Sequence, residues 1–280
     1  MNNNFYQKKI LLICPRFFDY EIEIKATLEK LGASVEFFDE RPKNSFFTKV
    51  LIRSDLEFFL TRRINSYYQV LFEIASKQVF DTVLIINPEV IDSTKLQYLR
   101  SLQPNARFIL YMWDSFKNKK GSRDLVYLFD KKVTFDRQDS TRYGLEFLPL
   151  FYINAYSENS VKSDFKYDIS FIGTAHSDRY KTAKIIENIA KGYDLKVFLY
   201  FFLPNAAMFW IRKFFFSSYQ YGEIGEFSFS SLSHREVASI FKSSKVILDI
   251  NHPEQAGLTS RSIEALGAKR KLITTNKTIV

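Results

Sequence analysis

The sequence contains one cysteine and three histidines, and it lacks the common phosphate-loop motifs. Cys14 alone can build neither a disulfide framework nor a thiolate metal site, which favours a reducing, cytoplasmic setting and argues against secretion. The three scattered histidines have no ligand spacing for zinc. Neither GxxxxGK(S/T) nor a G-x-G-x-x-G after the first apolar run is present, which argues against a P-loop kinase and a standard dinucleotide oxidoreductase.

Long uninterrupted hydrophobic runs are also absent. The apolar stretch near the N-terminus has about six residues, too few for a signal-peptide core or a membrane span. The most apolar region, residues 195–216, is interrupted by Lys196, Pro204, Asn205, Arg212 and Lys213. Charged residues are costly in hydrocarbon, and Pro204 separates a strand-like run from a helical one. We therefore expect a strand followed by an aromatic helix in this region.

The residues that are present indicate a folded protein with a surface partner. The chain of 280 residues suggests one large domain or two ordinary ones, and 46% hydrophobic residues suffice for a core. It has 29 Phe, 16 Tyr and a net charge of +9. This composition suits nucleic acid, an anionic membrane surface or a negatively charged small molecule such as a nucleotide. The basic residues form no single dense run and no nucleic-acid motif occurs, so nucleic acid is not the expected partner.

Strand and helix patterns alternate along the chain. In the first half, short apolar runs predict strands at residues 10–14, 34–38, 82–86, 107–112 and 132–135, and helical spacing predicts helices at 20–31, 46–76 and 92–102. In the second half, the same patterns predict strands at 167–172, 195–202, 245–250 and 271–275, and helices at 178–191, 206–216, 234–242 and 260–266. Such alternation implies mostly parallel sheets that are covered on both faces.

The expected fold class is α/β, with two Rossmann-like domains in tandem. Residues 1–153 are predicted to form an N-terminal domain, the polar stretch 154–166 a linker, and residues 167–280 a C-terminal domain. Two such domains facing each other form a cleft, where ligands usually bind. Because the chain stops soon after a strand, we expect a C-terminal element of the second domain to be missing.

Residues 249–276 have the pattern of a phosphate-binding turn. A strand ends, a polar loop contains Gly257, and Thr259 or Ser260 caps a helix whose first turns contain Arg261 and Glu264. Free amides, hydroxyls and a guanidinium at a helix N-terminus bind phosphate oxygens, and a carboxylate one turn later can accept hydrogen bonds from ribose hydroxyls. An ordinary capped helix with solvated charges has the same pattern.

This segment resembles the donor-binding segment of GT-B glycosyltransferases, especially the bacterial polysaccharide-biosynthesis enzymes of the group 1 and spore-maturation-protein-like types. The matching residues are Gly257, Leu258, Thr259, Arg261, Glu264-Ala265-Leu266 and the strand KLITTN. The resemblance implies that the second domain binds a nucleotide sugar. It assigns the diphosphate to Gly257, Leu258, Thr259, Ser260 and Arg261, and the ribose to Glu264. Retaining members often have an acidic residue eight positions before this glutamate, where this chain has Ala256, so retention and inversion both stay open.

Residues 167–180 form a second candidate turn, in which an apolar strand leads into polar residues. Gly173 and Thr174 follow the apolar run, and His176 and Arg179 stand at a helix start. In the resembling family this turn borders the cleft and contacts the donor phosphates or the transferred sugar. The resemblance therefore implies donor contacts for Gly173, Thr174 and Arg179, and a catalytic role for His176. A lone histidine is otherwise more often structural or merely exposed.

Polar residues also follow strands in the first domain, where open α/β sheets have their working residues. Trp113 and Asp114 follow one strand, Arg137 another, and Arg16 the first. We expect Asp114 to act as a catalytic general base that takes the proton of the acceptor hydroxyl in an inverting transfer. Arg16, Trp113 and Arg137 are expected on the acceptor side. A helix cap is the alternative role for Asp114.

The resemblance implies chemistry that needs no cofactor and no bound metal, because GT-B enzymes stabilise the leaving diphosphate with helix dipoles and basic side chains. No Asp-x-Asp motif is present near a strand end. We therefore expect a cytoplasmic glycosyltransferase that moves a hexosyl or related group from a nucleotide sugar to a glycan. The expected acceptor is a surface polysaccharide, such as lipopolysaccharide or capsule, or a lipid-linked oligosaccharide.

Two segments, 46–68 and 208–216, combine aromatic residues with Lys and Arg. They are predicted either to pack the domains together or to contact the cytoplasmic face of the membrane, where a lipid-linked acceptor is presented. Two alternatives to an active enzyme also stay open. One is a non-catalytic nucleotide- or nucleic-acid-binding protein, and the other is an inactive, truncated transferase.

Overall fold

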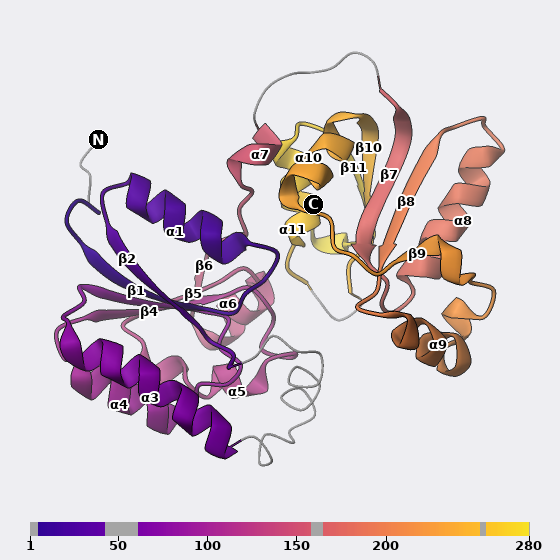
Figure 1. The fold of residues 1–280 in the computed structure, drawn as a ribbon. Coiled ribbons are helices and arrows are strands. Elements are labelled where there is room, and N and C mark those ends of the chain that lie inside the picture. The colour runs from indigo at the N-terminus through magenta and orange to yellow at the C-terminus, as the bar shows by residue number, and fades with distance from the viewer. Residues whose placement is uncertain (1–4, 43–60, 158–164, 253–255, 280) are drawn as a thin grey trace. The chain divides into compact units, whose positions relative to one another are not determined.

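The computed structural model describes residues 5–42, 61–157, 165–252 and 256–279. The chain divides into two compact units, Met1–Pro149 (unit 1) and Leu150–Val280 (unit 2). Each unit contains one parallel sheet with helices packed against it (Figure 1). The units are described separately below.

Unit 1 contains a six-stranded parallel sheet with the strand order β2-β1-β3-β4-β5-β6. Its strands are β1 (Lys9–Cys14), β2 (Ser34–Asp39), β3 (Thr82–Ile86), β4 (Arg107–Met112), β5 (Lys131–Thr134) and β6 (Glu146–Phe147). Its helices are α1 (Tyr20–Lys30), α3 (Thr61–Lys77), α4 (Ser93–Leu102), α5 (Lys120–Arg123) and α6 (Arg137–Tyr143). The five predicted strands are confirmed, whereas β6 was not predicted. Residues 46–60 of the helix predicted at 46–76 lie outside the described residues.

The apolar runs of unit 1 form strands because both faces of the sheet are covered. Residues 10–14 of β1, the strand between β2 and β3, are all buried, as expected for a central parallel strand. Helix α1 covers one face of the sheet, and α3 and α4 cover the other (Figure 1). Helix α4 begins at Asp92, whose carboxylate accepts a hydrogen bond from the amide of Lys95 at 2.8 Å. Such an N-cap defines the residue at which the loop after a strand ends and the next helix begins.

Unit 2 contains a five-stranded parallel sheet with the strand order β11-β10-β7-β8-β9. Its strands are β7 (Tyr167–Thr174), β8 (Val197–Phe202), β9 (Phe227–Ser228), β10 (Ser244–Asp249) and β11 (Lys271–Thr274). Its helices are α7 (Asn154–Ser157), α8 (Arg179–Lys191), α9 (Ala206–Phe215), α10 (His234–Lys242) and α11 (Ser260–Gly267). The strand and aromatic helix predicted for 195–216 are confirmed as β8 and α9. Among the described residues, no helix is both long enough and apolar enough to cross a bilayer.

Aromatic rings fill the core of unit 2 between the sheet and helices α8 and α9. The Phe227 ring lies 5.1 Å from the rings of both Tyr180 and Phe209, measured between centroids. Phe201 and Tyr219 complete this group, and Tyr219 is fully buried. The high Phe and Tyr content of the chain therefore serves partly as ordinary core packing.

The first four residues of the predicted linker form α7. Tyr156 in this helix is 2% exposed, and its hydroxyl lies 3.0 Å from Nδ1 of His234 in α10. Residues 158–164 of the predicted linker lie outside the described part of the chain. The boundary between the two compact units lies between Pro149 and Leu150, whereas the sequence predicted it after residue 153.

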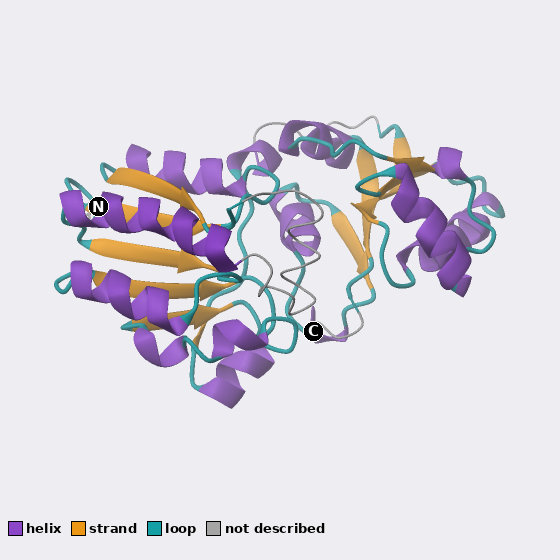
Figure 2. Ribbon diagram, turned by 60° about the horizontal axis from the view of Figure 1, so that its bottom comes forward, coloured by secondary structure: helices purple, strands orange, loops and turns teal. Residues whose placement is uncertain are grey.

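Parallel strands place all their carboxyl ends at one edge of each sheet, as the arrowheads of unit 1 show in Figure 2. In unit 1 this edge includes the loops after Cys14, Asp39, Ile86, Met112 and Thr134. In unit 2 it includes the loops after Thr174, Asp249 and Thr274. Ligands of open α/β sheets bind at such edges.

Candidate anion-binding site

Arg179 lies at the centre of the carboxyl edge of unit 2. It is the first residue of α8, and its Nε donates a 2.6 Å hydrogen bond to the carbonyl of Ile250 beyond β10. Its Nη1 donates to the carbonyl of Thr174 at 3.3 Å. A Cβ atom at Gly173 would lie 3.0 Å from Cζ of Phe171 and 3.4 Å from this Nη1, so Gly173 mainly leaves room for the Phe171 ring. Arg179 therefore connects the loop after β7 to the end of β10.

His176 lies in the same loop as Arg179 and close to a second histidine. Its ring centroid is 5.6 Å from that of His252, and its Nδ1 is 3.2 Å from the hydroxyl of Ser177. Burial, together with the charges of Arg179 and Arg212 and the neighbouring His252, lowers the pKa of His176 to about 3. His176 is therefore a neutral imidazole at physiological pH.

The cluster formed by His176, Arg179, Arg212 and His252 is electropositive, and we call it the cationic cluster. Burial lowers the pKa of Arg179 to about 10, against the charge of Asp249, which raises it. Arg212 extends from α9, with its guanidinium carbon 5.6 Å from the centroid of the Tyr219 ring. Burial outweighs the charges of Asp249 and Asp178, which act in the opposite direction on Arg179, so a bound anion would offset part of the cost of burying this cation.

The start of α11 is fixed by a network of hydroxyl groups. The Thr259 hydroxyl accepts a hydrogen bond from the Ser262 amide at 3.1 Å and donates one to Asp249 at 2.8 Å. The hydroxyls of Ser262 and Thr274 also donate to Asp249, at 2.6 and 3.4 Å. Asp249 is 2% exposed, so three hydroxyls and no cation satisfy its carboxylate among the described contacts.

The loop before α11 is held from the other side by Asn276, which follows β11. The Asn276 side-chain amide donates to the carbonyls of Ala256 and Gly257 at 3.2 and 3.1 Å. Gly257 is buried, whereas Leu258 and Ser260 are partly exposed. The predicted diphosphate residues of this loop are therefore rigidly positioned at the same sheet edge as Arg179.

Arg261 and Glu264, predicted to bind phosphate and ribose, contact each other. They form an ion pair at 2.6 Å, in which Glu264 is 2% exposed. The Arg261 guanidinium also lies 5.5 Å from the centroid of the Phe241 ring in α10. Its charge contributes to the lowered pKa of Arg179, which places Arg261 within electrostatic range of the cationic cluster. Their assigned roles stay predictions.

The predicted residues of unit 1 lie at the carboxyl edge of its sheet but do not form one group. Asp114 accepts hydrogen bonds from the Ser115 amide at 2.9 Å and from the Asn118 side chain at 2.8 Å, so it caps a turn. The Trp113 ring packs edge-on against Tyr20 and Tyr111. Separate contacts are made by Arg137, over the Phe147 ring at 4.3 Å, and by Arg16, 3.6 Å from Asp39.

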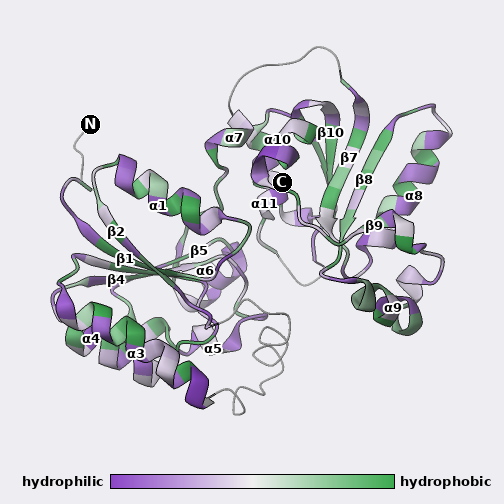
Figure 3. Ribbon diagram, in the orientation of Figure 1, coloured by the Kyte–Doolittle hydropathy of each residue, from purple (hydrophilic) through white to green (hydrophobic). Residues whose placement is uncertain are grey.

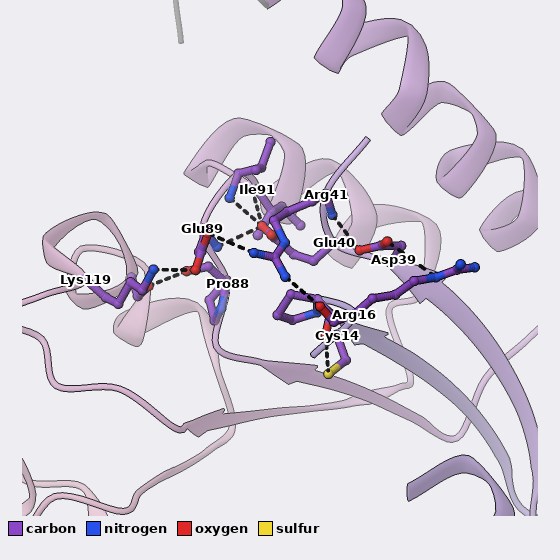
Figure 4. Close-up of polar contacts among 12 residues, drawn as sticks. Cys14, Arg16, Asp39, Glu40, Arg41, Pro88, Glu89, Ile91 and Lys119 are labelled. Atoms are coloured by element: carbon purple, nitrogen blue, oxygen red, sulfur yellow. Dashed lines mark hydrogen bonds and ion pairs between the residues drawn. The ribbon is translucent and has the colours of Figure 1, made fainter. Parts of the chain in front are cut away.

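A buried charge network, which was not predicted from the sequence, lies at this edge (Figure 4). Glu89 forms ion pairs with both Arg41, at 3.6 Å, and Lys119. The side chains of Arg41 and Glu89 are 4% and 7% exposed. The Arg41 guanidinium also donates to the carbonyl of Arg16 at 2.9 Å, which ties the loop after β1 to the loop after β2.

Glu40, next to Arg41, is fully buried and occupies a nest of backbone amides. Its Oε1 accepts hydrogen bonds from the amides of Glu89 and Ile91, at 2.8 and 2.9 Å, and from that of Val90. Burial raises the pKa of Glu40 to about 7, although these three amides act in the opposite direction. The sequence signal was the run Asp39-Glu40-Arg41 at the end of β2, the kind of strand end that was considered for other strands.

A partly open pocket of about 430 Å³ adjoins this network. Its lining comes from the end of β3, the start of α4 and helix α5, and it includes Pro88, Glu89, Asp92, Ser122 and Tyr127. Within the described residues, no group of three or more His, Cys, Asp or Glu side chains could hold a metal ion. The expectation of metal-independent chemistry stays a prediction.

No known protein family matches this sequence, and no curated protein matches it. Among the solved structures that share its fold are two proteins of similar TM-score. A glycosyltransferase from Rickettsia africae has a TM-score of 0.54 and 14% identity, over 96% of this chain and 79% of that chain. HepE from Anabaena, solved in complex with UDP and glucose, has a TM-score of 0.54 and 10% identity, over 96% and 80% of the two chains. The predicted fold class, α/β with two Rossmann-like domains as in GT-B enzymes, is therefore confirmed.

Proposed function

We propose that this protein is a glycosyltransferase that uses a nucleotide-sugar donor and transfers the sugar to a surface polysaccharide or a lipid-linked oligosaccharide. The observation that carries the proposal is the cationic cluster at the carboxyl edge of the unit 2 sheet, centred on Arg179. A diphosphate group matches this cluster in charge, because a guanidinium donates paired hydrogen bonds to phosphate oxygens. HepE, which shares the fold, was solved with UDP and glucose.

Each group of the cluster has a role in this proposal. Arg179 binds the diphosphate, and the neutral imidazole of His176 donates one hydrogen bond to it. The backbone amides at the start of α11, near Gly257 and Ser260, also bind this anion in the proposal, because the N-terminus of a helix carries partial positive charge. Charge develops on the diphosphate as the bond to the sugar breaks, so these donors stabilise the transition state more than the ground state.

The general base of the proposed reaction is Asp114. An imidazole with a pKa of about 3, as in His176, has little affinity for the proton of an acceptor hydroxyl. Asp114 stays partly exposed at the edge of the unit 1 sheet, and two hydrogen bonds fix its orientation. Arg16, Trp113 and Arg137 belong to the acceptor side of this proposal. The proposed location is the cytoplasm, with peripheral association at the membrane.

The proposal is tested by thermal unfolding of the protein with UDP, GDP, CDP, ADP and dTDP. A nucleotide at about 100 times its dissociation constant stabilises the protein by about 2.7 kcal/mol, which raises the Tm by several degrees. We expect one nucleotide to give this shift in the wild type and in Arg235→Gln, whose exposed side chain lies on α10. The shift should be lost in Arg179→Gln.

An absence of any shift would overturn the donor-site proposal. Equal, salt-sensitive binding of all five nucleotides and of single-stranded nucleic acid would instead support a non-catalytic binding protein. Transfer of sugar from the selected nucleotide sugar to a glycan acceptor, and its loss in Asp114→Asn, then tests the catalytic part of the proposal.

A further inference from the structure

Helix α9 of unit 2 has an unusual distribution of side chains around its axis. Phe209 faces the core and is 1% exposed. The side of the helix that faces away from the core contains Trp210, Ile211, Phe214 and Phe215, which we call the α9 aromatic face. Trp210 and Ile211 are each 48% exposed, and Phe214 and Phe215 are each 79% exposed. A surface helix normally presents polar side chains to solvent.

The two cations of α9 turn toward the protein instead. Arg212 lies over the Tyr219 ring. The Lys213 ammonium donates to the carbonyl of Gly222 at 2.8 Å and lies 5.7 Å from the Phe209 ring centroid. Figure 3 shows α9 as predominantly hydrophobic along its length. The outward side of α9 is therefore aromatic, because its two cationic side chains contact the protein and do not cover this side.

The apolar surface continues beyond the helix. Phe216 is 52% exposed and Tyr221 is 86% exposed, so the exposed aromatic residues extend past the end of α9. Contiguous apolar surface of this kind is rare on soluble proteins unless a partner covers it. Between residues 203 and 222 the chain has two cations, Arg212 and Lys213, and no Asp or Glu. The charge of this segment complements an anionic surface.

We propose that the α9 aromatic face inserts into the interfacial region of a bilayer that contains anionic lipids. Helix α9 has 10 residues and spans about 15 Å, half the thickness of the hydrocarbon core, so it lies along the surface. Trp and Phe favour the headgroup region, and the positive charges of Arg212 and Lys213 behind them attract anionic lipids over a longer range. A lipid surface accounts for both the aromatic residues and the absence of carboxylates.

The position of Arg212 connects this surface to the proposed donor site. Its charge lowers the pKa of His176, so the helix that contacts the bilayer also borders the cationic cluster. Membrane binding itself does not depend on the proposed function, because vesicles and nucleotides are tested in separate assays. A protein that binds vesicles without binding nucleotides would retain this inference and lose the donor site.

Co-sedimentation with vesicles tests the inference. The vesicles contain either phosphatidylcholine alone or phosphatidylcholine with phosphatidylglycerol, and no nucleotide is added. We expect the wild type to bind the anionic vesicles, and the double variant Phe214→Ser, Phe215→Ser to bind them at least about tenfold more weakly. The matched control is Ile185→Ser, Ile189→Ser on α8, where the two side chains are 50% and 58% exposed. The control should bind like the wild type.

Two outcomes would overturn the inference. In one, the Phe214→Ser, Phe215→Ser variant binds anionic vesicles as well as the control does. In the other, light scattering shows a wild-type dimer that this variant converts to a monomer, with no vesicle binding by either protein. The α9 aromatic face would then be an interface between two copies of the chain. Because both replaced side chains are largely exposed, the variant is expected to fold.

Discussion

The buried charges at the two sheet edges are compensated in different ways. In unit 1, the buried Glu89 carboxylate forms ion pairs with two cations, Arg41 and Lys119. In unit 2, the buried carboxylate of Asp249 is satisfied by hydroxyl groups, while Arg179 donates to backbone carbonyls. The unit 1 edge therefore holds buried ions in direct pairs, whereas at the unit 2 edge the described hydrogen bonds of Arg179 and Asp249 go to uncharged groups.

This difference shows how two parallel sheets of one chain, with different strand orders, can take different roles. The fold places polar residues at the carboxyl edges of both sheets, but the local charge decides what binds there. In the proposed function, the unit 2 edge binds the diphosphate of the donor. The unit 1 edge, which adjoins a pocket, is then the side proposed for the acceptor. The predictions below alter one edge at a time.

The largest effect is expected from removal of the shared negative charge in unit 1. Glu89→Gln leaves Arg41 and Lys119 without their common partner in a buried site, so we expect a loss of about 3 kcal/mol or more in the free energy of unfolding. Urea denaturation measures this loss. The control is Glu146→Gln, which breaks an exposed ion pair with Lys131 and should cost less than about 1 kcal/mol. Equal costs for the two variants would contradict the compensated edge.

The second prediction concerns the pH dependence of unit 1 stability. The pKa of Glu40 is raised from 4.5 to about 7 in the folded protein, so the folded state holds a proton that the unfolded state has lost between these values. The contribution of Glu40 therefore falls as the pH rises from about 4.5 to 7, by roughly 3 kcal/mol in total. Glu40→Gln should lack this fall.

Urea unfolding at pH 5 and pH 8 tests this prediction. In a Trp210→Phe background, the emission of Trp113 reports on unit 1, because the chain has two tryptophans. Glu36→Gln, at an exposed position of β2, is the control and should keep the wild-type pH dependence. Parallel pH curves for Glu40→Gln and Glu36→Gln would show that Glu40 is ionised in the folded protein.

The strands could be predicted from the sequence because each is a short apolar run bounded by polar residues. The predictions 82–86 and 107–112 coincide with β3 and β4. The strands β6 and β9 were not predicted, because a strand of two residues is too short to show an alternating pattern. Helix α9 was predicted, but the sequence left open whether the aromatic residues of 208–216 pack inside the protein or contact a membrane, because helical spacing alone does not tell which side contacts the core.

The candidate site could be predicted where its residues are neighbours in the sequence. Arg179 and His176 lie in one turn, and the structure places them together. Glu40 and the amide of Ile91 are 51 residues apart, so their contact depends on the order of strands in the sheet. The Arg261–Glu264 pair was visible as an i, i+3 spacing, but the motif resemblance favoured ligand contacts over an ion pair.

The third prediction concerns the cationic cluster. His176→Ala should weaken binding of the selected nucleotide sugar about tenfold, or about 1.4 kcal/mol, because one hydrogen bond to a charged group is lost. Calorimetric titration measures the change. His234→Ala is the control, since that ring contacts Tyr156, and it should leave the affinity unchanged. If His176 stays neutral when the nucleotide sugar binds, the affinity will not change between pH 6 and 8. An affinity that rises toward pH 6 would show that His176 binds the diphosphate in its protonated form.

The smallest effect is expected at Thr259, where unit 2 uses a hydroxyl in place of a cation. Thr259→Val removes both the cap of α11 and a donor to Asp249, so the free energy of unfolding should fall by about 1 kcal/mol. Thr259→Ser retains the hydroxyl and should cost less. Urea unfolding in a Trp113→Phe background, followed by Trp210 emission, compares the two. If Thr259→Val and Thr259→Ser lower the free energy of unfolding equally, the Thr259 hydroxyl does not stabilise the Asp249 carboxylate. The charge of Arg179 would then be what balances Asp249, and the two sheet edges would not differ in how their charges are compensated.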